Sequence, residues 1–354
     1  MNLTAYIRAV KVCLTTNLKS NTKLVVFIFL QVMFQKIRKY IFTEEKVPMY
    51  KPVRHTFFRD PKIADILHNE GYYIADFLEE KERKLLLELY EKKHSLNQNQ
   101  DGVFFGTFSK DQQYRKTVHE TVNAILADSF DKWFVHFKST INNYVIKTPG
   151  KATRVPVHQD GAALDEEKYS SINIWIPLQD ATPVNGALHV IPRSHNIFWP
   201  YRCNTVPSMV KNIEQELYPY FYPVYLKLGQ VLFFDSRLFH FSTPNLSDKN
   251  RVVIVSRICP DNSPVVSYYR DTGLENAPVE MWQCPDDFLI NMVGYNETTR
   301  PMGATWIKNM RVRTAPLTLD EFERRRKQLG INPRHINEAN YTDPTNFLME
   351  PVNK

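Results

Sequence analysis

The chain has 354 residues, enough for one large hydrophobic core or two smaller ones. Its net charge of +7 comes from residues 1–43, which hold seven basic and no acidic residues and leave 38 of the 45 bases against 38 acids elsewhere. This balance excludes a basic nucleic-acid-binding domain. Four cysteines without C-x-x-C spacing favour a reducing compartment over a disulfide scaffold or a zinc site.

Residues 1–45 form a basic, partly amphipathic extension, and residues 46–60 read as a proline-bearing linker. The apolar run Leu24–Leu30 is shorter than the roughly 20 residues that cross a bilayer. Apolar positions 30, 33, 34, 37 and 41 recur with a helical period opposite a basic face. Three interpretations stay open: peripheral contact of residues 24–42 with an anionic membrane, a helix docked on the domain, or a targeting peptide. We expect a cytoplasmic protein, with membrane association as the alternative.

The domain is predicted to span residues 61–315 and to begin with helices. The pattern predicts a strand over 71–77 and helices over 63–69, 79–94, 111–127 and 131–142. Trp133, Phe134, Phe137 and Ile141 would share one face of the last helix. A capping box at Thr318–Glu321 predicts a further helix that ends at Gly330, within a C-terminal helix and tail over 316–354.

From residue 143 the pattern changes to short strands, predicted over 144–147, 155–158, 171–177, 186–191, 224–228, 230–234 and 251–258. In the third of these, Ile172, Ile174 and Ile176 alternate with Asn173 and Trp175, so the two sets should face opposite sides. Short strands without regularly alternating helices predict a mainly β fold with flanking helices. Its core, over about 143–260, would be a double-stranded β-helix of the jelly-roll or cupin-like type. The aromatic segment 198–222 is a candidate lid.

A candidate metal site starts at His158-Gln159-Asp160, where the strand 155–158 runs into a loop. A neutral imidazole, a carboxylate and a second histidine form the 2-His-1-carboxylate triad, which suits non-haem Fe(II) and leaves coordination positions open. The second histidine is expected to be His240, at the end of the strand that starts near residue 230. His189 and His195 are alternatives for this role.

A candidate anion site follows in the sequence. The strand after His240 opens with Arg251, whose guanidinium could bind a carboxylate in the same cavity if the two strands lie side by side. Ser242 would add a hydroxyl donor.

These motifs together resemble a known family. The order HQD, INIWIPLQDATPVNGALHVIPRSH and GQVLFFDSRLFHFSTPNLSDKNR, over roughly residues 63–260, is similar to the phytanoyl-CoA dioxygenase family of Fe(II)/2-oxoglutarate oxygenases. The resemblance implies that iron binds His158, Asp160 and His240, which are then the catalytic residues. It also implies that Arg251 and Ser242 hold the distal carboxylate of the cosubstrate 2-oxoglutarate. Gln159, Trp175 and Tyr144 would contact this cosubstrate or wall the pocket.

The implied activity is hydroxylation of an aliphatic C–H of a small-molecule or acyl-type substrate, with O2 and 2-oxoglutarate consumed and succinate and CO2 released. Asp160 favours hydroxylation over chlorination, because halogenases of this fold lack the carboxylate. The alternative is a non-catalytic jelly-roll protein that binds or senses a ligand and retains the metal site. One departure from the family is Arg193, where glycine is usual, so the turn could differ or an extra cation could stand at the pocket rim. The oligomeric state and the particular substrate are not readable from the sequence.

Overall fold

A computed structural model describes residues 50–94, 102–291 and 299–334. The basic extension, its segment 24–42 and the end of the C-terminal tail lie outside the described residues. Among the residues described, no helix has the length and apolar character needed to cross a membrane.

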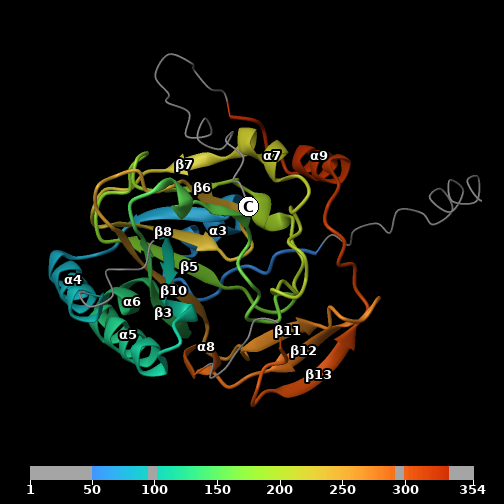
Figure 1. The fold of residues 1–354 in the computed structure, drawn as a ribbon, viewed down its shortest axis with the longest axis horizontal. Coiled ribbons are helices and arrows are strands. Elements are labelled where there is room, and N and C mark those ends of the chain that lie inside the picture. The colour runs from blue at the N-terminus through green and yellow to red at the C-terminus, as the bar shows by residue number, and fades with distance from the viewer. Residues whose placement is uncertain (1–49, 95–101, 292–298, 335–354) are drawn as a thin grey trace, which may run out of the picture. The chain divides into compact units, whose positions relative to one another are not determined.

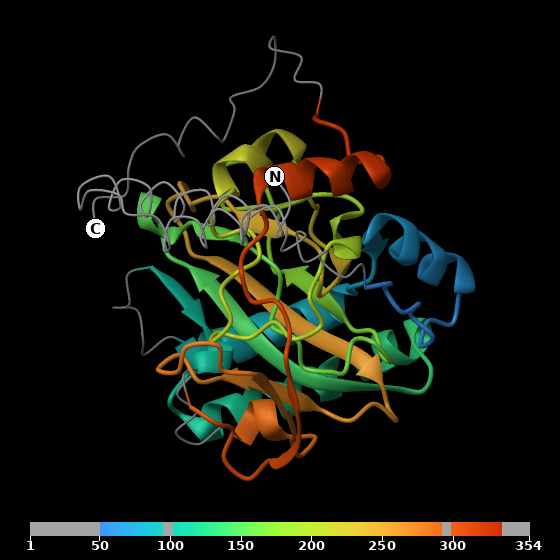
Figure 2. The same ribbon diagram turned by 90° about the vertical axis from the view of Figure 1, so that its right-hand side faces the viewer.

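Two antiparallel sheets form the centre of the fold (Figures 1 and 2). The larger sheet has the order β1 (Tyr72–Asp76), β8 (Gln230–Asp235), β5 (Ile172–Pro177), β10 (Arg251–Pro260), β3 (Phe137–Lys147) and β2 (Val103–Phe105). The smaller sheet has the order β4 (Val155–His158), β9 (His240–Ser242), β6 (Leu188–Val190) and β7 (Tyr222–Val224). The predicted mainly β fold with a double-stranded β-helix core is confirmed.

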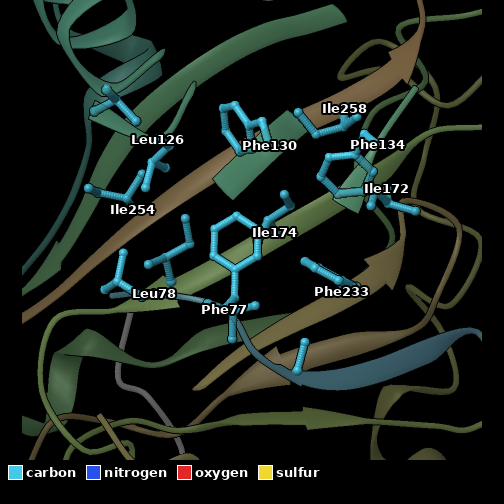
Figure 3. Close-up of a cluster of buried hydrophobic side chains, with 14 of the residues drawn as sticks. Phe77, Leu78, Leu126, Phe130, Phe134, Ile172, Ile174, Phe233, Ile254 and Ile258 are labelled. Atoms are coloured by element: carbon cyan, nitrogen blue, oxygen red, sulfur yellow. The ribbon is translucent and has the colours of Figure 1, made fainter. Parts of the chain in front are cut away.

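Helices cover the outer face of the larger sheet (Figure 1). They are α3 (Pro61–Glu70), α4 (Glu80–His94), α5 (Gln112–Ile125) and α6 (Ala127–Trp133). Figure 3 shows the core between these helices and the sheet, where Phe77, Phe130 and Phe134 pack with Ile174 and Phe233. The predicted alternation in β5 is confirmed, because its three isoleucines lie in this outer core while Trp175 packs on the opposite face, toward the smaller sheet.

The remaining described elements lie at the periphery. A third sheet contains β11 (Val266–Arg270), β12 (Val279–Gln283) and β13 (Thr305–Met310), and short helices are α7 (Glu214–Leu217) and α8 (Phe288–Asn291). Single 3₁₀ turns are η1 (Gly106–Phe108), η2 (Lys151–Thr153), η3 (Ser194–Asn196) and η4 (Tyr218–Tyr220). Helix α9 (Leu319–Gln328) has the predicted capping box between Thr318 and Glu321.

Residues 50–60, expected in the linker, contribute to the outer core. His55, Phe57 and Phe58 are buried there, and Asp60 caps the start of α3 through the backbone N–H of Lys62. Helix α3 ends at Gly71, whose φ of +86° places it in the left-handed region. A Cβ at Gly71 would lie 2.5 Å from Nδ1 of His195, so only glycine fits this turn.

The helix predicted over 131–142 is wrong after Trp133. Helix α6 ends there, His136 has a positive φ of 48°, and β3 starts at Phe137. The strand then pairs with β10 along its whole length, from Phe137 opposite Pro260 to Lys147 opposite Arg251. This long ladder satisfies the backbone polar groups and outweighs the local helical spacing of the apolar residues. The strand predicted over 224–228 is also displaced, since β7 ends at Val224.

Candidate metal centre

Two histidines face each other on paired strands of the smaller sheet. His158 ends β4, His240 opens β9, and the two residues are direct register partners with ring centroids 4.1 Å apart. Asp160 lies in the loop after β4, with its Oδ1 3.7 Å from Nε2 of His158 and 3.9 Å from Nε2 of His240. One ligand atom from each of the three residues lies within 4.8 Å of the others. The structure thus brings the predicted triad together.

The sequence predicted that the strand starting near residue 230 ends at His240, but the structure differs. β8 ends at Asp235, a turn follows, and His240 opens a strand of the other sheet. The alternatives to His240 lie elsewhere: the ring of His195 hydrogen-bonds the carbonyl of His68 at 2.9 Å, and Nδ1 of His189 lies 3.3 Å from the carbonyl of Ala187.

The donor set fits a divalent metal. Nδ1 of His158 lies 2.8 Å from the carbonyl of Pro156, and Nδ1 of His240 lies 3.0 Å from the carbonyl of Leu238. Because a carbonyl only accepts hydrogen bonds, each Nδ1 carries a proton, and Nε2 is the ring nitrogen that faces the cluster. Burial, with the neighbouring His158, lowers the pKa of His240 to about 4, so this imidazole is neutral at pH 7.

Asp160 carries the charge of the site. Burial by itself would raise the pKa of Asp160, but the nearby His240, Arg257, His158 and Arg202 together lower it. Two imidazoles and one carboxylate are the ligands that suit Fe(II) in an open site.

The triad lies at a cavity of about 620 Å³ between the two sheets. From the larger sheet, Asn173 and Trp175 on β5 and Arg251, Val255 and Arg257 on β10 line it. The cavity wall is more apolar than polar and includes Phe105, Phe108, Trp199, Met209, Val266 and Phe288. The candidate lid segment therefore contributes to the cavity wall through residues 199–209.

Arg251 enters this cavity from the larger sheet. Its strand lies between β5 and β3, so the expected neighbourhood with the strand of His240 is wrong. Arg251 nevertheless lines the same cavity as His240 and Ser242 on β9. Arg251 is 2% exposed, its Nε and Nη1 have no hydrogen-bond partner among the described residues, and its Cζ lies 5.4 Å from the ring centre of Trp175. Burial lowers its pKa to about 9. A buried, unpaired guanidinium is costly, which fits a site for an anionic group.

Gln159, Trp175 and Ser242 also line the cavity, as predicted from the resemblance. The amide nitrogen of Gln159 donates to the carbonyl of Ile197 at 2.9 Å, so this side chain holds the loop beside the metal position.

Tyr144 is the exception and lies in the outer core. Its hydroxyl donates to the carbonyl of Leu86 at 2.7 Å, and it is not among the cavity residues. Strand residues alternate between faces, so its neighbours Asn143 and Val145 line the cavity instead.

Arg193 does not add a cation to the cavity. It keeps the turn that glycine would make, with a φ of 68°, and its guanidinium pairs with Glu70 at 2.8 Å. A non-glycine residue with this φ lies in the left-handed region, which strains the backbone.

Three residues of the site were missed from the sequence. Asn173 donates to Oδ2 of Asp160, Arg257 donates to Asn173 at 3.2 Å, and Arg202 donates to the backbone carbonyl of Asp160 at 2.8 Å. The alternation in β5 had already placed Asn173 on the face of Trp175, so that signal was available. Nothing in the sequence pattern marks Arg202.

The facing sheets and the triad between them define a jelly-roll protein with a candidate facial-triad metal site. The sequence model of one family, Phytanoyl-CoA dioxygenase (PhyH), matches residues 55–253. The chain belongs to the phytanoyl-CoA dioxygenase family.

Curated relatives match over part of their length. A phytanoyl-CoA dioxygenase domain-containing protein 1 homolog of Dictyostelium discoideum is 28% identical over 142 residues, which are 38% of this chain and 50% of that protein. A phytanoyl-CoA dioxygenase of Arabidopsis thaliana is 32% identical over 114 residues, 30% of this chain and 39% of that protein. The chain thus spans half or less of the length of these relatives.

Solved structures with a partial likeness include SnoK, a non-heme alpha ketoglutarate dependent carbocyclase from nogalamycin biosynthesis. It has 19% identity and a TM-score of 0.42, covering 58% of this chain and 86% of that chain. EvdO2 from Micromonospora carbonacea complexed with 2-oxoglutarate has 17% identity and a TM-score of 0.40, covering 59% of this chain and 93% of that chain.

Proposed function

We propose that the chain is an Fe(II)- and 2-oxoglutarate-dependent dioxygenase that hydroxylates an aliphatic C–H of a mainly apolar small molecule or acyl group. The observation that carries this proposal is the unpaired, buried Arg251 in the same cavity as the triad of His158, Asp160 and His240. A metal ligand set with open positions and a buried cation together match a cosubstrate with a keto acid at one end and a carboxylate at the other.

The residues of this chain bind and orient the reactants. Arg251 would receive the distal carboxylate of 2-oxoglutarate, with Ser242 as a second donor and Trp175 beside the guanidinium. His158, Asp160 and His240 would hold Fe(II), which supplies the O2 chemistry when bound. In each turnover, one substrate C–H bond, one 2-oxoglutarate and one O2 would give one alcohol, one succinate and one CO2.

The apolar wall of the cavity supports the substrate class. Phe105, Phe108, Met209, Val266 and Phe288 offer no charge to a substrate, so binding would come from buried apolar area. Such a wall holds a C–H bond in place and excludes water from the reacting atoms.

The direct test is succinate formation from 2-oxoglutarate by the full chain with Fe(II), O2 and a panel of apolar candidates. Asp160→Ala should abolish it, and unchanged turnover in this variant contradicts the ligand assignment. If Fe(II) and 2-oxoglutarate bind but no candidate stimulates succinate formation, the result favours a non-catalytic binding protein.

A further inference from the structure

The two carboxylate oxygens of Asp160 have different surroundings. Oδ1 faces the histidine Nε2 atoms at 3.7 and 3.9 Å, whereas Oδ2 accepts a hydrogen bond from Nδ2 of Asn173. Asn173 lies on the cavity face of β5 and is 2% exposed. One oxygen is therefore turned to the metal position and the other is occupied by the protein.

Arg257 fixes the orientation of Asn173. The two residues are register partners on β10 and β5, and Nε of Arg257 donates to Oδ1 of Asn173 at 3.2 Å. Nη1 of Arg257 donates to the carbonyl of Gly161, the residue after Asp160, at 3.1 Å. A guanidinium only donates and a carboxylate only accepts, so an amide between them satisfies both in one orientation only.

The backbone of Asp160 is held independently of this chain of contacts. Its N–H donates to the carbonyl of Ser236 at 3.0 Å, and its carbonyl accepts from Nε of Arg202 at 2.8 Å. Arg202 is itself fixed by a buried ion pair with Glu166. Loss of Arg257 removes its contact to Gly161 but leaves these two backbone hydrogen bonds of Asp160, so it should release the side chain of Asp160 more than the loop.

We propose that Arg257 is a positioning residue that acts through Asn173 to keep Oδ2 of Asp160 away from the metal, so that the carboxylate binds through Oδ1 alone. This inference rests on the proposed function, because it assigns a role around the same metal. A carboxylate that binds through one oxygen occupies one coordination position, and a second bound oxygen would take a position that the cosubstrate and O2 need.

The same strand supplies a matched control. Arg251 and Arg257 lie on the same face of β10, six residues and about 20 Å apart along the strand. Arg251 is assigned to the cosubstrate, and Arg257 is assigned to the metal ligand. Equivalent substitutions at the two arginines should therefore separate the two functions.

The experiment measures the dissociation constant for Mn(II) of the chelator-treated full chain, from the electron paramagnetic resonance signal of free Mn(II). Arg257→Met and Asn173→Ala should each raise this constant by about 10- to 100-fold. Arg251→Met should leave it unchanged and weaken 2-oxoglutarate binding instead. Arg257→Lys retains a donor for Asn173 and should fall between wild type and Arg257→Met.

The double variant decides whether the two residues act in series. If Arg257 works through Asn173, combining Arg257→Met with Asn173→Ala should weaken Mn(II) binding no more than the stronger single change. The proposal is overturned if the two substitutions multiply each other's effect on the dissociation constant for Mn(II). It is also overturned if folded Arg257→Met has the same dissociation constant for Mn(II) as wild type. Should Arg257→Met not fold, judged by far-UV circular dichroism, Arg257→Lys and Asn173→Ala carry the test. Wild type that binds neither Mn(II) nor 2-oxoglutarate would instead reject the proposed function, and this inference with it.

Discussion

Replacing Arg251 by methionine should make the protein more stable without cosubstrate and insensitive to cosubstrate. Burial lowers the pKa of Arg251 from 12.5 to about 9, which corresponds to about 5 kcal/mol at 1.36 kcal/mol per pH unit. Arginine stays protonated at pH 7, so burying its charge lowers the free energy of unfolding by this amount. The contact with Trp175 returns about 1–2 kcal/mol. Arg251→Met should therefore raise the free energy of unfolding by about 3 kcal/mol, within the range seen for buried charges replaced by apolar residues.

The assay is urea unfolding of Mn(II)-loaded protein with and without 2-oxoglutarate. At 100 times its dissociation constant, 2-oxoglutarate should stabilise wild type by about 2.7 kcal/mol and Arg251→Met by almost nothing. The same substitution at Arg237 is the control, since Arg237 is equally buried but pairs with Asp235. Arg237→Met should destabilise by about 3–5 kcal/mol, because it leaves the buried carboxylate of Asp235 without its arginine partner and with only His55 beside it.

Two results would exclude an anion site at Arg251. One is an Arg251→Met variant that is less stable than wild type in the absence of cosubstrate, and the other is a variant that 2-oxoglutarate stabilises as much as the wild type. Either result would mean that the guanidinium is compensated by the protein itself and is not a binding site for an anion.

Three further predictions concern the rest of the chain. Burial lowers the pKa of His195 from 6.5 to about 4, so as pH drops the unfolded chain takes up a proton before the folded chain does. The free energy of unfolding should therefore fall between pH 6.5 and pH 4, by about 3 kcal/mol for this group. In urea unfolding, His195→Gln should make the free energy of unfolding depend less on pH over that range. Position 193 has a φ of 68°, so Arg193→Gly should be more stable than Arg193→Ala by about 1 kcal/mol in thermal unfolding, and the reverse order would show that no strain is stored there. Removal of residues 1–43 should reduce co-sedimentation with anionic liposomes, whereas equal partitioning would exclude a membrane role for the basic extension.

The sequence predicted the parts of the site that depend on short motifs. His158, Asp160 and His240 could be found because a metal needs particular side chains, and Arg251 because it opens a recognisable strand. Trp175 was placed on the correct face because β5 alternates regularly between the two sides of the sheet. These predictions depend only on residues close together in the sequence, so they do not require knowledge of which distant strands pair.

The errors come from pairing between distant segments. The start of β3 was read as helix because its apolar residues have helical spacing, and only the ladder to β10 makes it a strand. Tyr144 was assigned to the pocket from the family resemblance, and the face of its strand could not be set without the partner strand. Arg257 and Asn173 meet through the register of β10 and β5, which no local pattern reveals.

A crystal structure of the full chain with Mn(II) and 2-oxoglutarate would test the metal and cosubstrate sites together. We expect anomalous metal density between Nε2 of His158, Nε2 of His240 and Oδ1 of Asp160, with the distal carboxylate of 2-oxoglutarate on the guanidinium of Arg251. Metal bound at other residues, or 2-oxoglutarate bound away from Arg251, would contradict this expectation.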